Sequence, residues 1–420
     1  MTLDLEKLVL DIARNARAAS QIMATISTTK KNRALAAIAE SIEHRKHFIQ
    51  QQNQIDLEQA WENGLSKAMI DRLTLSDKVL QAVIDGLHEV IALPDPVGKI
   101  EYGITRPNGL KVSKMRVPLG VIGMIYESRP NVTVDAAGLC LKTGNACILR
   151  GGKEAFHSNV ALAKIICDAL GKAGLPEHTV QVLPVTDREA VNILLKQEAY
   201  IDLIIPRGGE GLIRNVVANS TIPVLKHYKG VCHIFVDNTA DFKMASDIIV
   251  NSKAQRPSAC NSAETVLVHK DIAKDFLPQM YAALKQAGVK VLGNMEAKAA
   301  APEMEAATDA DWGTEYLDYT INVKVVDNIE EAVSHIRRYN SNHTDVIVTE
   351  SYSNAEEFIR TVDASMVGVN ASTRFNDGNQ LGLGAEIGIS TSKLHAYGPM
   401  GLEELTTTKF VVMGSGQIRE

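Results

Sequence analysis

Short apolar runs alternate with helix-like runs through the middle of the chain, and this alternation most constrains its fold. The strand-like runs are Leu119–Tyr126, Ala146–Leu149, Val180–Leu183, Ile201–Ile205 and Ile222–Leu225. Helix-like runs lie between them, at Thr133–Thr143, Ala155–Ala173, Arg188–Lys196 and Gly211–Ser220. Apolar strands joined by helices form a parallel sheet that is covered on both faces. This part of the chain therefore predicts an α/β domain.

Helical periodicity precedes this domain and a second alternation follows it. Apolar spacing predicts helices from Leu3 to about Asn63 and again over Leu73–Ile91, which we expect to cover the sheet. Beyond the strand-like Val231–Val236, the chain predicts another α/β domain. Its predicted strands are Glu264–His269, Val289–Leu292, Tyr319–Val326, Val346–Val348 and Met366–Val369, and its predicted helices are Asp241–Lys253, Ile272–Ala287, Ile329–Tyr339 and Asn354–Val362.

A hairpin and a long tail stand apart from both alternations. Asn108-Gly109 between β-prone flanks predicts a tight turn within Glu101–Arg116. Its faces are polar, so we expect an arm that protrudes and pairs with another subunit, although a plain surface hairpin fits the same sequence. The Gly- and Thr-rich tail over 371–416 carries the strand-like Lys409–Met413, which we expect to dock on another surface, perhaps the hairpin of a partner subunit.

Composition excludes several classes of protein. A net charge of -6 over 420 residues argues against a surface for nucleic acid or anionic membranes. Five widely spaced cysteines with no CxxC pattern predict neither a disulfide framework nor a metal site. The N-terminus has no signal-peptide apolar core, and no apolar run approaches the length of a membrane span. These features predict a reduced, cytoplasmic protein.

One cysteine differs from the other four in its surroundings. Cys260 lies in the polar stretch Gln255–Ala263, between a helix-like and a strand-like run, whereas the others have apolar neighbours. A cysteine among apolar residues usually packs as a small hydrophobe. A thiol in a polar loop beside a cation such as Arg256 can instead become a thiolate, the form that attacks carbon. The local sequence leaves both a nucleophile and an incidental loop cysteine open.

Two glycine-rich turns follow predicted strands of the first sheet. They are Arg150-Gly-Gly-Lys153 after one strand and Arg207-Gly-Gly-Glu-Gly211 after another. Glycines let the backbone approach a phosphate, a helix N-terminus supplies N–H donors, and Arg or Lys supplies charge. Ligands of parallel sheets bind beyond the carboxyl ends of the strands. The spacing is not GxGxxG, and either turn alone could be an ordinary one, but the pair favours a nucleotide site.

A nucleotide-type domain followed by an exposed cysteine that opens a second α/β domain resembles the aldehyde dehydrogenase superfamily. Within that superfamily, Val326–Ile347 is similar to the signature of the gamma-glutamyl phosphate reductase family, with His335, Tyr339 and Ser341–Asp345 at matching positions. Asn340 stands where that family more often has Gly or Ser, which bears on a turn. Further similar blocks over essentially the whole chain are Leu119–Asn131, Gln255–Ser262 and Ala371–Gly378.

The resemblance implies an aldehyde-dehydrogenase-like α/β fold, with two Rossmann-type parallel-sheet domains and a small β oligomerisation arm. Residues 1–98 and 117–229 would form the NADP-binding domain, and residues 230–380 the catalytic domain with the nucleophilic cysteine. Residues 99–116 and 381–420 would form the arm and the tail. The hairpin and tail favour a homo-oligomer, most simply a two-fold dimer.

The resemblance also implies a reaction. L-glutamyl 5-phosphate would be reduced by NADPH to L-glutamate 5-semialdehyde with release of phosphate, as in proline biosynthesis. Cys260 would attack the acyl carbon and carry a thioester until hydride arrives. The hydrolytic aldehyde dehydrogenases activate water with a glutamate, but the aligned position here is near His227, and no carboxylate is offered. An association with glutamate kinase, which makes the acyl phosphate, stays open.

Site residues are carried over position by position. Arg150 and Lys153 match the strand end that binds the adenosine ribose, where their charge suits a 2′-phosphate and hence NADP(H). Gly208 and Gly209 match the pyrophosphate turn, and Glu315 matches the carboxylate that holds the nicotinamide ribose. An amino acid bearing a carboxylate and a phosphate requires cations and amides. The candidates for substrate binding are therefore Arg129, Asn131, His227, Asn261, Arg374 and Asn376.

Two other functions remain in competition. A CoA-acylating aldehyde dehydrogenase would share the nucleophile and also lack water activation, but it would depend on CoA rather than on phosphate. A nucleotide-binding regulatory or scaffold subunit could keep the fold without the chemistry. Cys260 and the two glycine turns argue against that last alternative.

Overall fold

The computed structural model describes residues 2–419 of the chain, which form two compact units. Unit 1 consists of Met1–Lys226, Leu383–Gly388 and Met400–Glu420. Unit 2 consists of His227–Gly382 and Ile389–Pro399. None of the described helices is both long and apolar enough to cross a membrane.

Five helices open unit 1, and polar caps set where they begin. They are α1 (Thr2–Met23), α2 (Thr28–His44), α3 (Lys46–Glu62), α4 (Lys67–Leu73) and α5 (Asp77–Ala92). The hydroxyls of Ser27, Ser66 and Ser76 each accept a hydrogen bond from the backbone N–H three residues later, at the starts of α2, α4 and α5. The predicted helical opening is confirmed.

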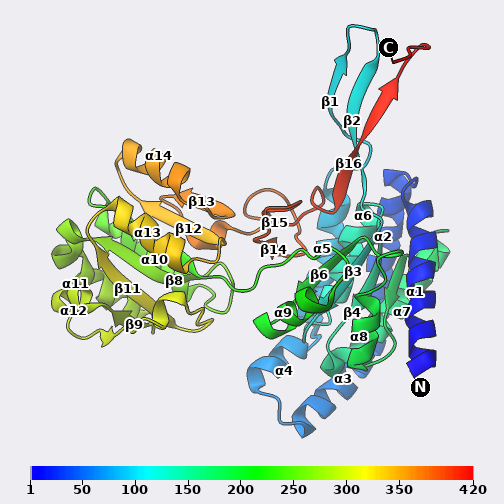
Figure 1. Ribbon diagram of the computed structural model, residues 1–420. Coiled ribbons are helices and arrows are strands. Elements are labelled where there is room, and N and C mark those ends of the chain that lie inside the picture. Colours follow the sequence, from blue (N-terminus) through cyan, green and yellow to red (C-terminus); the bar gives the residue numbers. More distant parts are fainter. Residues whose placement is uncertain (1, 420) are drawn as a thin grey trace. The chain divides into compact units, whose positions relative to one another are not determined.

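The first parallel sheet follows these helices in the chain, and its strands have the order β5-β4-β3-β6. Its strands are β3 (Val121–Tyr126), β4 (Ala146–Arg150), β5 (Val180–Val182) and β6 (Leu203–Arg207), and all pair in parallel. The intervening helices are α6 (Val132–Lys142), α7 (Phe156–Lys172), α8 (Arg188–Leu194) and α9 (Glu210–Asn219). Figure 1 shows this unit in blue to green. The carboxyl ends of β4, β3 and β6 therefore lie next to one another.

The prediction of a fifth strand at Ile222–Leu225 is wrong. Only Val224 forms a parallel bridge, to Ile204, and the flanking bonds join the Ile204 N–H to the Pro223 carbonyl and the Leu225 N–H to the Ile204 carbonyl. Pro223 has no N–H to donate, so the ladder does not extend. The chain leaves the sheet after Leu225.

The arm is a three-stranded antiparallel sheet of β1 (Ile100–Thr105), β2 (Lys111–Pro118) and β16 (Thr406–Met413). In Figure 1, β1 and β2 are cyan and β16 is red. The predicted hairpin and late strand are confirmed. The expected docking of the tail on a partner's hairpin is wrong, because β16 pairs with β2 of its own chain from Thr406↔Pro118 to Met413↔Lys111.

Unit 2 is built on a second parallel sheet with the order β10-β9-β11-β8-β7-β12-β13. The strands are β7 (Cys232–Val236), β8 (Ala263–His269), β9 (Lys290–Gly293), β10 (Glu305–Ala306), β11 (Thr320–Val326), β12 (Thr344–Val348) and β13 (Met366–Val369). The helices are α10 (Phe242–Ala254), α11 (Lys270–Gln286), α12 (Met295–Ala300), α13 (Ile329–Tyr339) and α14 (Tyr352–Thr361). The sequence did not predict α12, β10 or the short strands β14 (Ile389–Ser390) and β15 (Gly398–Pro399).

Both faces of this second sheet are buried, which explains why its strands are apolar throughout. Val266 and Val268 pack in one core with residues of α10, α11 and α12. Leu267, between them, packs on the other face with residues of α13 and α14. Successive side chains of a strand point to opposite faces, so a strand covered on both sides shows no polar alternation.

A buried carboxylate joins the opening helices to the first sheet. Asp56 on α3 accepts from the backbone N–H groups of His157 (3.1 Å) and Ser158 (2.8 Å) and from the Ser158 hydroxyl (2.6 Å). It also lies 2.9 Å from His157 Nδ1. A negative charge at the N-terminus of α7 satisfies donors that the helix itself leaves unpaired. Asp56 thereby fixes the helix that follows the Arg150–Lys153 turn.

We predict that Asp56→Ala lowers the stability of unit 1 by about 3 kcal/mol, because several buried donors lose their shared acceptor. The apparent Tm should fall by about 8 °C in a thermal melt followed by circular dichroism. Glu58→Ala is the control, since this α3 carboxylate is exposed and accepts a hydrogen bond from Gln54 on the same helix. Equal Tm values for the two variants would contradict the assigned role.

Candidate active site

Cys260 lies at the amino edge of the second sheet, in the loop between α10 and β8. Two turns shape this loop, with the Ala259 N–H donating to the Arg256 carbonyl (3.1 Å) and the Ser262 N–H donating to the Ala259 carbonyl (2.9 Å). Cys260 is partly exposed, whereas three of the other cysteines are buried. Cys167 is also partly exposed, but its thiol donates to the Val180 carbonyl in unit 1. Cys260 is thus the accessible thiol of unit 2.

Gly230 brings a second backbone segment against this loop. A Cβ added to Gly230 would overlap the carbonyl oxygen of Cys260 and lie 2.7 Å from its carbonyl carbon. Backbone atoms cannot swing aside as a flexible side chain can, so the approach requires glycine. The Gly230 N–H donates to the Glu315 carboxylate at 2.8 Å. Glu315 therefore lies beside the segment that supports the nucleophile loop.

Two buried amides tie the loop to the late block of the chain. Asn261 donates through Nδ2 to the carbonyl of Asn376 at 2.9 Å. Asn376 donates in turn to Thr344 Oγ1 (2.8 Å) and to the His343 carbonyl (3.2 Å). The side-chain oxygens of both asparagines are buried without a hydrogen-bond partner. Buried polar atoms are nearly always paired, so these two oxygens are candidates for contact with a ligand.

Histidines line the same edge of unit 2. His227 Nδ1 lies 2.8 Å from the carbonyl oxygen of Ile389 in β14. A carbonyl only accepts, so Nδ1 carries a proton and donates in this contact. The rings of His227 and His343 meet edge to face, with centroids 5.7 Å apart. Burial lowers the pKa of His343 to about 4, so this imidazole is neutral at physiological pH.

The signature segment Val326–Ile347, which contains α13, makes hydrogen bonds to the segment around Gly230 and within its own turn. Ser341 Oγ accepts from the N–H of Val231, next to Gly230, at 2.8 Å. Asn340 accepts from the Asn342 N–H (2.9 Å) and donates to Asp345 (3.0 Å), so its side chain holds the turn. The departure from the family pattern at Asn340 therefore adds turn contacts instead of removing them.

Arg374, in the late block Ala371–Gly378, lies beside the nucleophile loop. Arg374 Nε donates to the Gln255 side chain at 2.9 Å, just before the loop. Burial and the like charge of Arg256 lower the pKa of Arg374, while the Cys260 thiolate would oppose that shift. Arg374 is thus close enough to Cys260 for the two charges to interact.

A fully buried ion pair lies near Glu315. Lys253 Nζ and Glu264 are 2.7 Å apart, with neither side chain exposed. Burial raises the pKa of Glu264 to about 7, against the lowering by Lys253, and the charge of Glu315 adds to the rise. Glu315 thus belongs to a charged cluster that spans α10, β8 and the segment before β11.

The glycine turns of unit 1 lie at neighbouring strand ends. A Cβ added to Gly208 would lie 2.5 Å from the Glu127 carboxylate, which accepts from the Gly209 N–H at 2.9 Å. A Cβ at Gly152 would overlap the Glu154 carboxylate, which is the movable end of a side chain. The Glu127 oxygen occupies a position that a phosphate oxygen could take. The turn before α9 therefore presents its amide to an anion.

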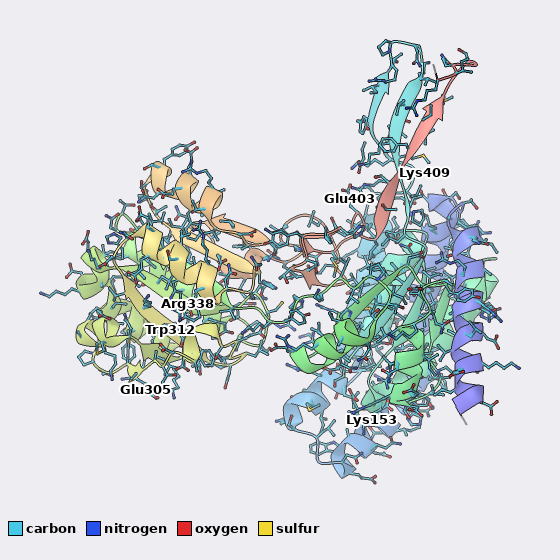
Figure 2. All side chains as sticks on the ribbon, viewed as in Figure 1. Lys153, Glu305, Trp312, Arg338, Glu403 and Lys409 are labelled. Carbon is cyan, nitrogen blue, oxygen red and sulfur yellow. The ribbon has the colours of Figure 1, made fainter. Side chains whose placement is uncertain are left out.

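Arg150 and Lys153, the two cations of the other glycine turn, differ in exposure and in hydrogen bonding. Arg150 is partly buried and donates to the carbonyls of Gly151 (2.9 Å) and Thr186 (3.1 Å). Lys153 is exposed at the start of the short helix after β4 and is labelled in Figure 2. Arg150 shapes the turn, and Lys153 is free to move toward a ligand.

Arg129 and Asn131 follow β3 in unit 1. Asn131 Nδ2 donates to Asp135 at 3.0 Å, one turn into α6, and the Arg129 carbonyl accepts from the Val132 N–H. These two candidates follow β3, whose carboxyl end lies between those of β4 and β6 that carry the glycine turns. The remaining substrate candidates, His227, Asn261, Arg374 and Asn376, lie in unit 2.

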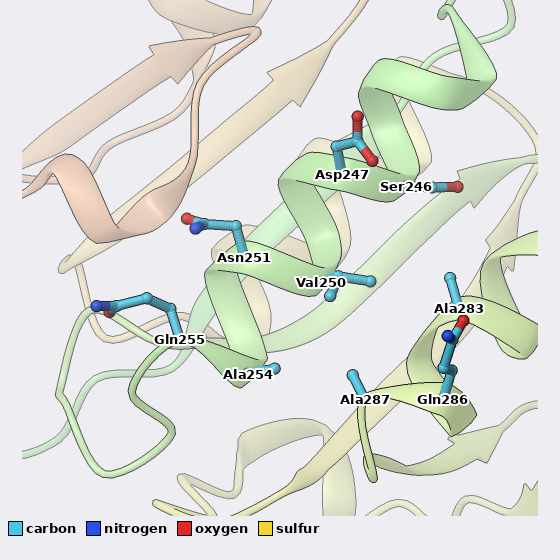
Figure 3. Close-up of a pocket in the computed structure, with 9 residues that line it drawn as sticks. All are labelled: Ser246, Asp247, Val250, Asn251, Ala254, Gln255, Ala283, Gln286 and Ala287. Carbon is cyan, nitrogen blue, oxygen red and sulfur yellow. The ribbon is translucent and has the colours of Figure 1, made fainter.

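A groove of about 580 Å³ lies between α10 and α11 (Figure 3). Val250, Ala254, Ala283 and Ala287 supply its apolar surface, and Gln255 lies at the end nearest the nucleophile loop. Cys260 does not line it, so we assign no catalytic role to the groove. Among residues 2–419, no cluster of His, Cys, Asp and Glu is arranged to hold a metal ion.

Sequence reasoning missed residues that act through the backbone. The sequence did not single out Gly230 or Cys232, and Ser341 and His343 entered only as positions of the family signature. The carboxyl-end rule for parallel sheets also points to the opposite edge of the second sheet. A possible signal was the glycine placed directly before the apolar run of β7, although glycine there also fits an ordinary turn.

The model of the aldehyde dehydrogenase family matches residues 4–308 of the chain. A gamma-glutamyl phosphate reductase of Desulforapulum autotrophicum is 60% identical over 416 residues, which cover 99% of this chain and 100% of that protein.

Solved structures show the same relationship. A gamma-glutamyl phosphate reductase from Thermotoga maritima has a TM-score of 0.97 at 47% identity, covering 98% of this chain and 100% of that one. An acetylating aldehyde dehydrogenase from Geobacillus thermoglucosidasius has a TM-score of 0.72 at 19% identity, covering 100% and 99%, and shares the fold alone. The predicted aldehyde-dehydrogenase-like α/β fold is confirmed.

We predict that Gly230→Ala lowers kcat about 100-fold, because the added methyl displaces the Cys260 backbone from its position. Steady-state assays of the family reaction measure the loss, and the far-ultraviolet circular dichroism spectrum should stay unchanged. Gly86→Ala is the matched control, since a Cβ at this position in α5 meets nothing within 4 Å. Wild-type kcat in Gly230→Ala would show that the loop does not depend on this contact.

Proposed function

The chain belongs to the gamma-glutamyl phosphate reductase family, within the aldehyde dehydrogenases, and on this premise we propose the reduction of L-glutamyl 5-phosphate to L-glutamate 5-semialdehyde in proline biosynthesis. The carrying observation is a partly exposed thiol whose backbone rests on Gly230, in a chain 60% identical to a named reductase. The enzyme is thus an oxidoreductase that acts on the aldehyde in the reverse direction.

The first chemical step is acyl transfer to Cys260. The Cys260 thiolate attacks the acyl carbon, the bond from that carbon to the phosphate oxygen breaks, and phosphate leaves. The product is a thioester on Cys260. Arg374, whose charge interacts with that of Cys260, lies beside the loop, and the N–H groups of Cys260 and Asn261 can donate to the developing oxyanion. In the described part of the chain, neither of these N–H groups has a hydrogen-bond partner.

The second step returns the thiol to its starting state. A bound nicotinamide supplies hydride, and the family is consistent with such a cofactor. Once the acyl carbon is reduced, its bond to Cys260 Sγ breaks, the aldehyde leaves and the thiolate is regenerated. The family resemblance places His227 near the position of the water-activating glutamate of hydrolytic aldehyde dehydrogenases. An imidazole there, with Nδ1 hydrogen-bonded to the Ile389 carbonyl, offers no carboxylate to activate water.

For the cofactor we propose NADP(H), bound by residues 1–98 and 117–229, with catalysis in residues 230–380. The turn residues fit a dinucleotide, because Gly208 and Gly209 already present an amide to a carboxylate oxygen. Arg150 and Lys153 would hold the 2′-phosphate, and Glu315 the nicotinamide ribose. Arg129, Asn131, His227, Asn261, Arg374 and Asn376 are proposed to bind the substrate.

We further propose that the chain forms a homo-oligomer through its arm and works in the cytoplasm. Tyr102 and Ile104 of β1 share one face of the arm with Phe410 and Val412 of β16, because paired residues of antiparallel strands lie on the same face. Phe410 is 65% exposed and Val412 57%. An exposed apolar face of this kind is typical of an interface. Association with glutamate kinase stays a prediction.

We predict that oxidation of L-glutamate 5-semialdehyde with NADP+ requires phosphate, because phosphate must attack the Cys260 thioester to release the product. Cys260→Ala should lower turnover roughly 10⁴-fold. Absorbance of the reduced nicotinamide measures both results, and Cys140→Ala, which changes a buried thiol of unit 1, is the control. Turnover that needs CoA in place of phosphate would favour the acylating aldehyde dehydrogenase alternative.

A second prediction concerns the coenzyme. Lys153→Ala should raise the Kd for NADPH about tenfold and leave the Kd for NADH unchanged, because one charge-assisted contact to the 2′-phosphate is lost. Titration calorimetry measures both constants without turnover. Lys172→Ala, an exposed lysine at the end of α7, is the control. A parallel rise of both constants would remove Lys153 from the 2′-phosphate site.

The arm gives a third prediction. Phe410→Lys combined with Val412→Lys should dissociate the oligomer, because two charges enter its apolar face. Light scattering after size-exclusion chromatography measures the mass in solution. Thr407→Lys places a charge on the opposite face of β16 and should leave the mass unchanged. A monomeric wild type would contradict the proposed assembly.

A further inference from the structure

A second thiol lies directly against the nucleophile loop. Cys232 is the first residue of β7 and is fully buried. Its Sγ lies 3.3 Å from the carbonyl oxygen of Cys260. A carbonyl oxygen only accepts, so the thiol donates in this contact. β7 and β8 run in parallel with Cys232 opposite Ala263, which places the thiol beside the segment that enters β8.

The surroundings of Cys232 keep its proton in place. Burial raises the pKa of this thiol well above its usual range. His343 Nδ1 is 3.8 Å from Sγ, but the same nitrogen lies 2.8 Å from Thr344 Oγ1. Burial holds the pKa of His343 near 4, so the imidazole does not take the thiol proton at neutral pH. The pair stays neutral, unlike the ion pair of an activated Cys–His nucleophile.

The bond to Cys232 sets the direction of a whole peptide group. In a trans peptide, the carbonyl and the following N–H point in opposite directions. The Cys260 carbonyl faces Cys232 and Gly230, so the N–H of Asn261 points away from them. That N–H lacks a hydrogen-bond partner within residues 2–419. It is therefore available to a group outside the loop.

We propose that Cys232 is a positioning residue for the nucleophile. Its thiol holds the Cys260 carbonyl, and this contact orients the Cys260–Asn261 peptide so that the Asn261 N–H faces the acyl oxygen. Gly230, which has no side chain, leaves space for the Cys260 carbonyl. The hydrogen bond from the Cys232 thiol sets the direction in which that carbonyl points. The proposal rests on the proposed function, because acyl transfer to Cys260 is the step that it serves.

Two substitutions at Cys232 separate direction from packing. Cys232→Ala removes the donor, whereas Cys232→Ser keeps a hydroxyl that can donate to the same carbonyl. Cys140→Ala is the matched control, because Cys140 is an equally buried thiol in α6 of unit 1. Thermal melts of all variants report changes in packing.

The first readout is turnover of L-glutamate 5-semialdehyde with phosphate and NADP+. Cys232→Ala should lower kcat about tenfold and leave KM for phosphate within about twofold, since tenfold corresponds to the loss of about 1.4 kcal/mol, within the range that one hydrogen bond contributes. Cys232→Ser should recover kcat to within about threefold of wild type, and Cys140→Ala should match wild type. A residue that only fills space would give no rescue by serine.

The second readout needs no substrate. Iodoacetamide alkylates the enzyme, and mass spectrometry of the peptide that contains Cys260 gives the rate of its modification. Cys232→Ala should slow this rate at least threefold at neutral pH by freeing the loop from its position near Arg374, whereas Cys232→Ser should not.

Failure of the two proposals can be told apart. If wild type does not oxidise L-glutamate 5-semialdehyde, the proposed function fails, and the alkylation rates still decide the role of Cys232. If wild type turns over and Cys232→Ala equals it in kcat and alkylation, the positioning role is overturned. Equal losses in Cys232→Ala and Cys232→Ser that follow a fall in Tm would also overturn it.

Discussion

The close approach of two backbone segments at the amino edge of the second sheet is the constraint on which the site depends. Parallel pairing of β7 with β8 brings the residues before each strand together. Only glycine at position 230 lets the Cys260 carbonyl sit where it does. Once that contact is made, the thiol, the Asn261 amide and the Glu315 carboxylate occupy fixed positions relative to one another. The chemistry follows from a steric fit between main chains.

Buried polar atoms without hydrogen-bond partners lie around this contact. The side-chain oxygens of Asn261 and Asn376 and the Nε2 of His343 are buried without partners. Leaving such an atom unpaired costs about 1–3 kcal/mol, and the three atoms belong to residues linked through hydrogen bonds to the Cys260 loop. The buried Lys253–Glu264 pair adds charges that an apolar core would not need. Functional sites keep groups of this kind because a bound ligand can satisfy them.

Sequence periodicity predicted the regular parts of the fold, because a strand that is buried on both faces is largely apolar along its length and can be recognised in the sequence. The strand Ala263–His269, buried along its whole length, shows it well. Ile222–Leu225 shows the same apolar pattern but forms a single bridge, since Pro223 lacks a donor. The local sequence singled out Cys260 and the glycine turns, and the family resemblance suggested their roles. Neither could show that β16 pairs with its own hairpin, or that Cys232 and Gly230 hold the Cys260 carbonyl, because such contacts depend on tertiary register.

The central claim is that Cys260 carries the acyl group between phosphate and hydride. The most direct measurement is the mass of the enzyme quenched after it meets L-glutamate 5-semialdehyde and NADP+ with phosphate withheld. The account predicts one glutamyl adduct per chain, found on the peptide that contains Cys260 and discharged when phosphate is added. An enzyme that reduces the coenzyme while its cysteine peptide stays unmodified would contradict the account.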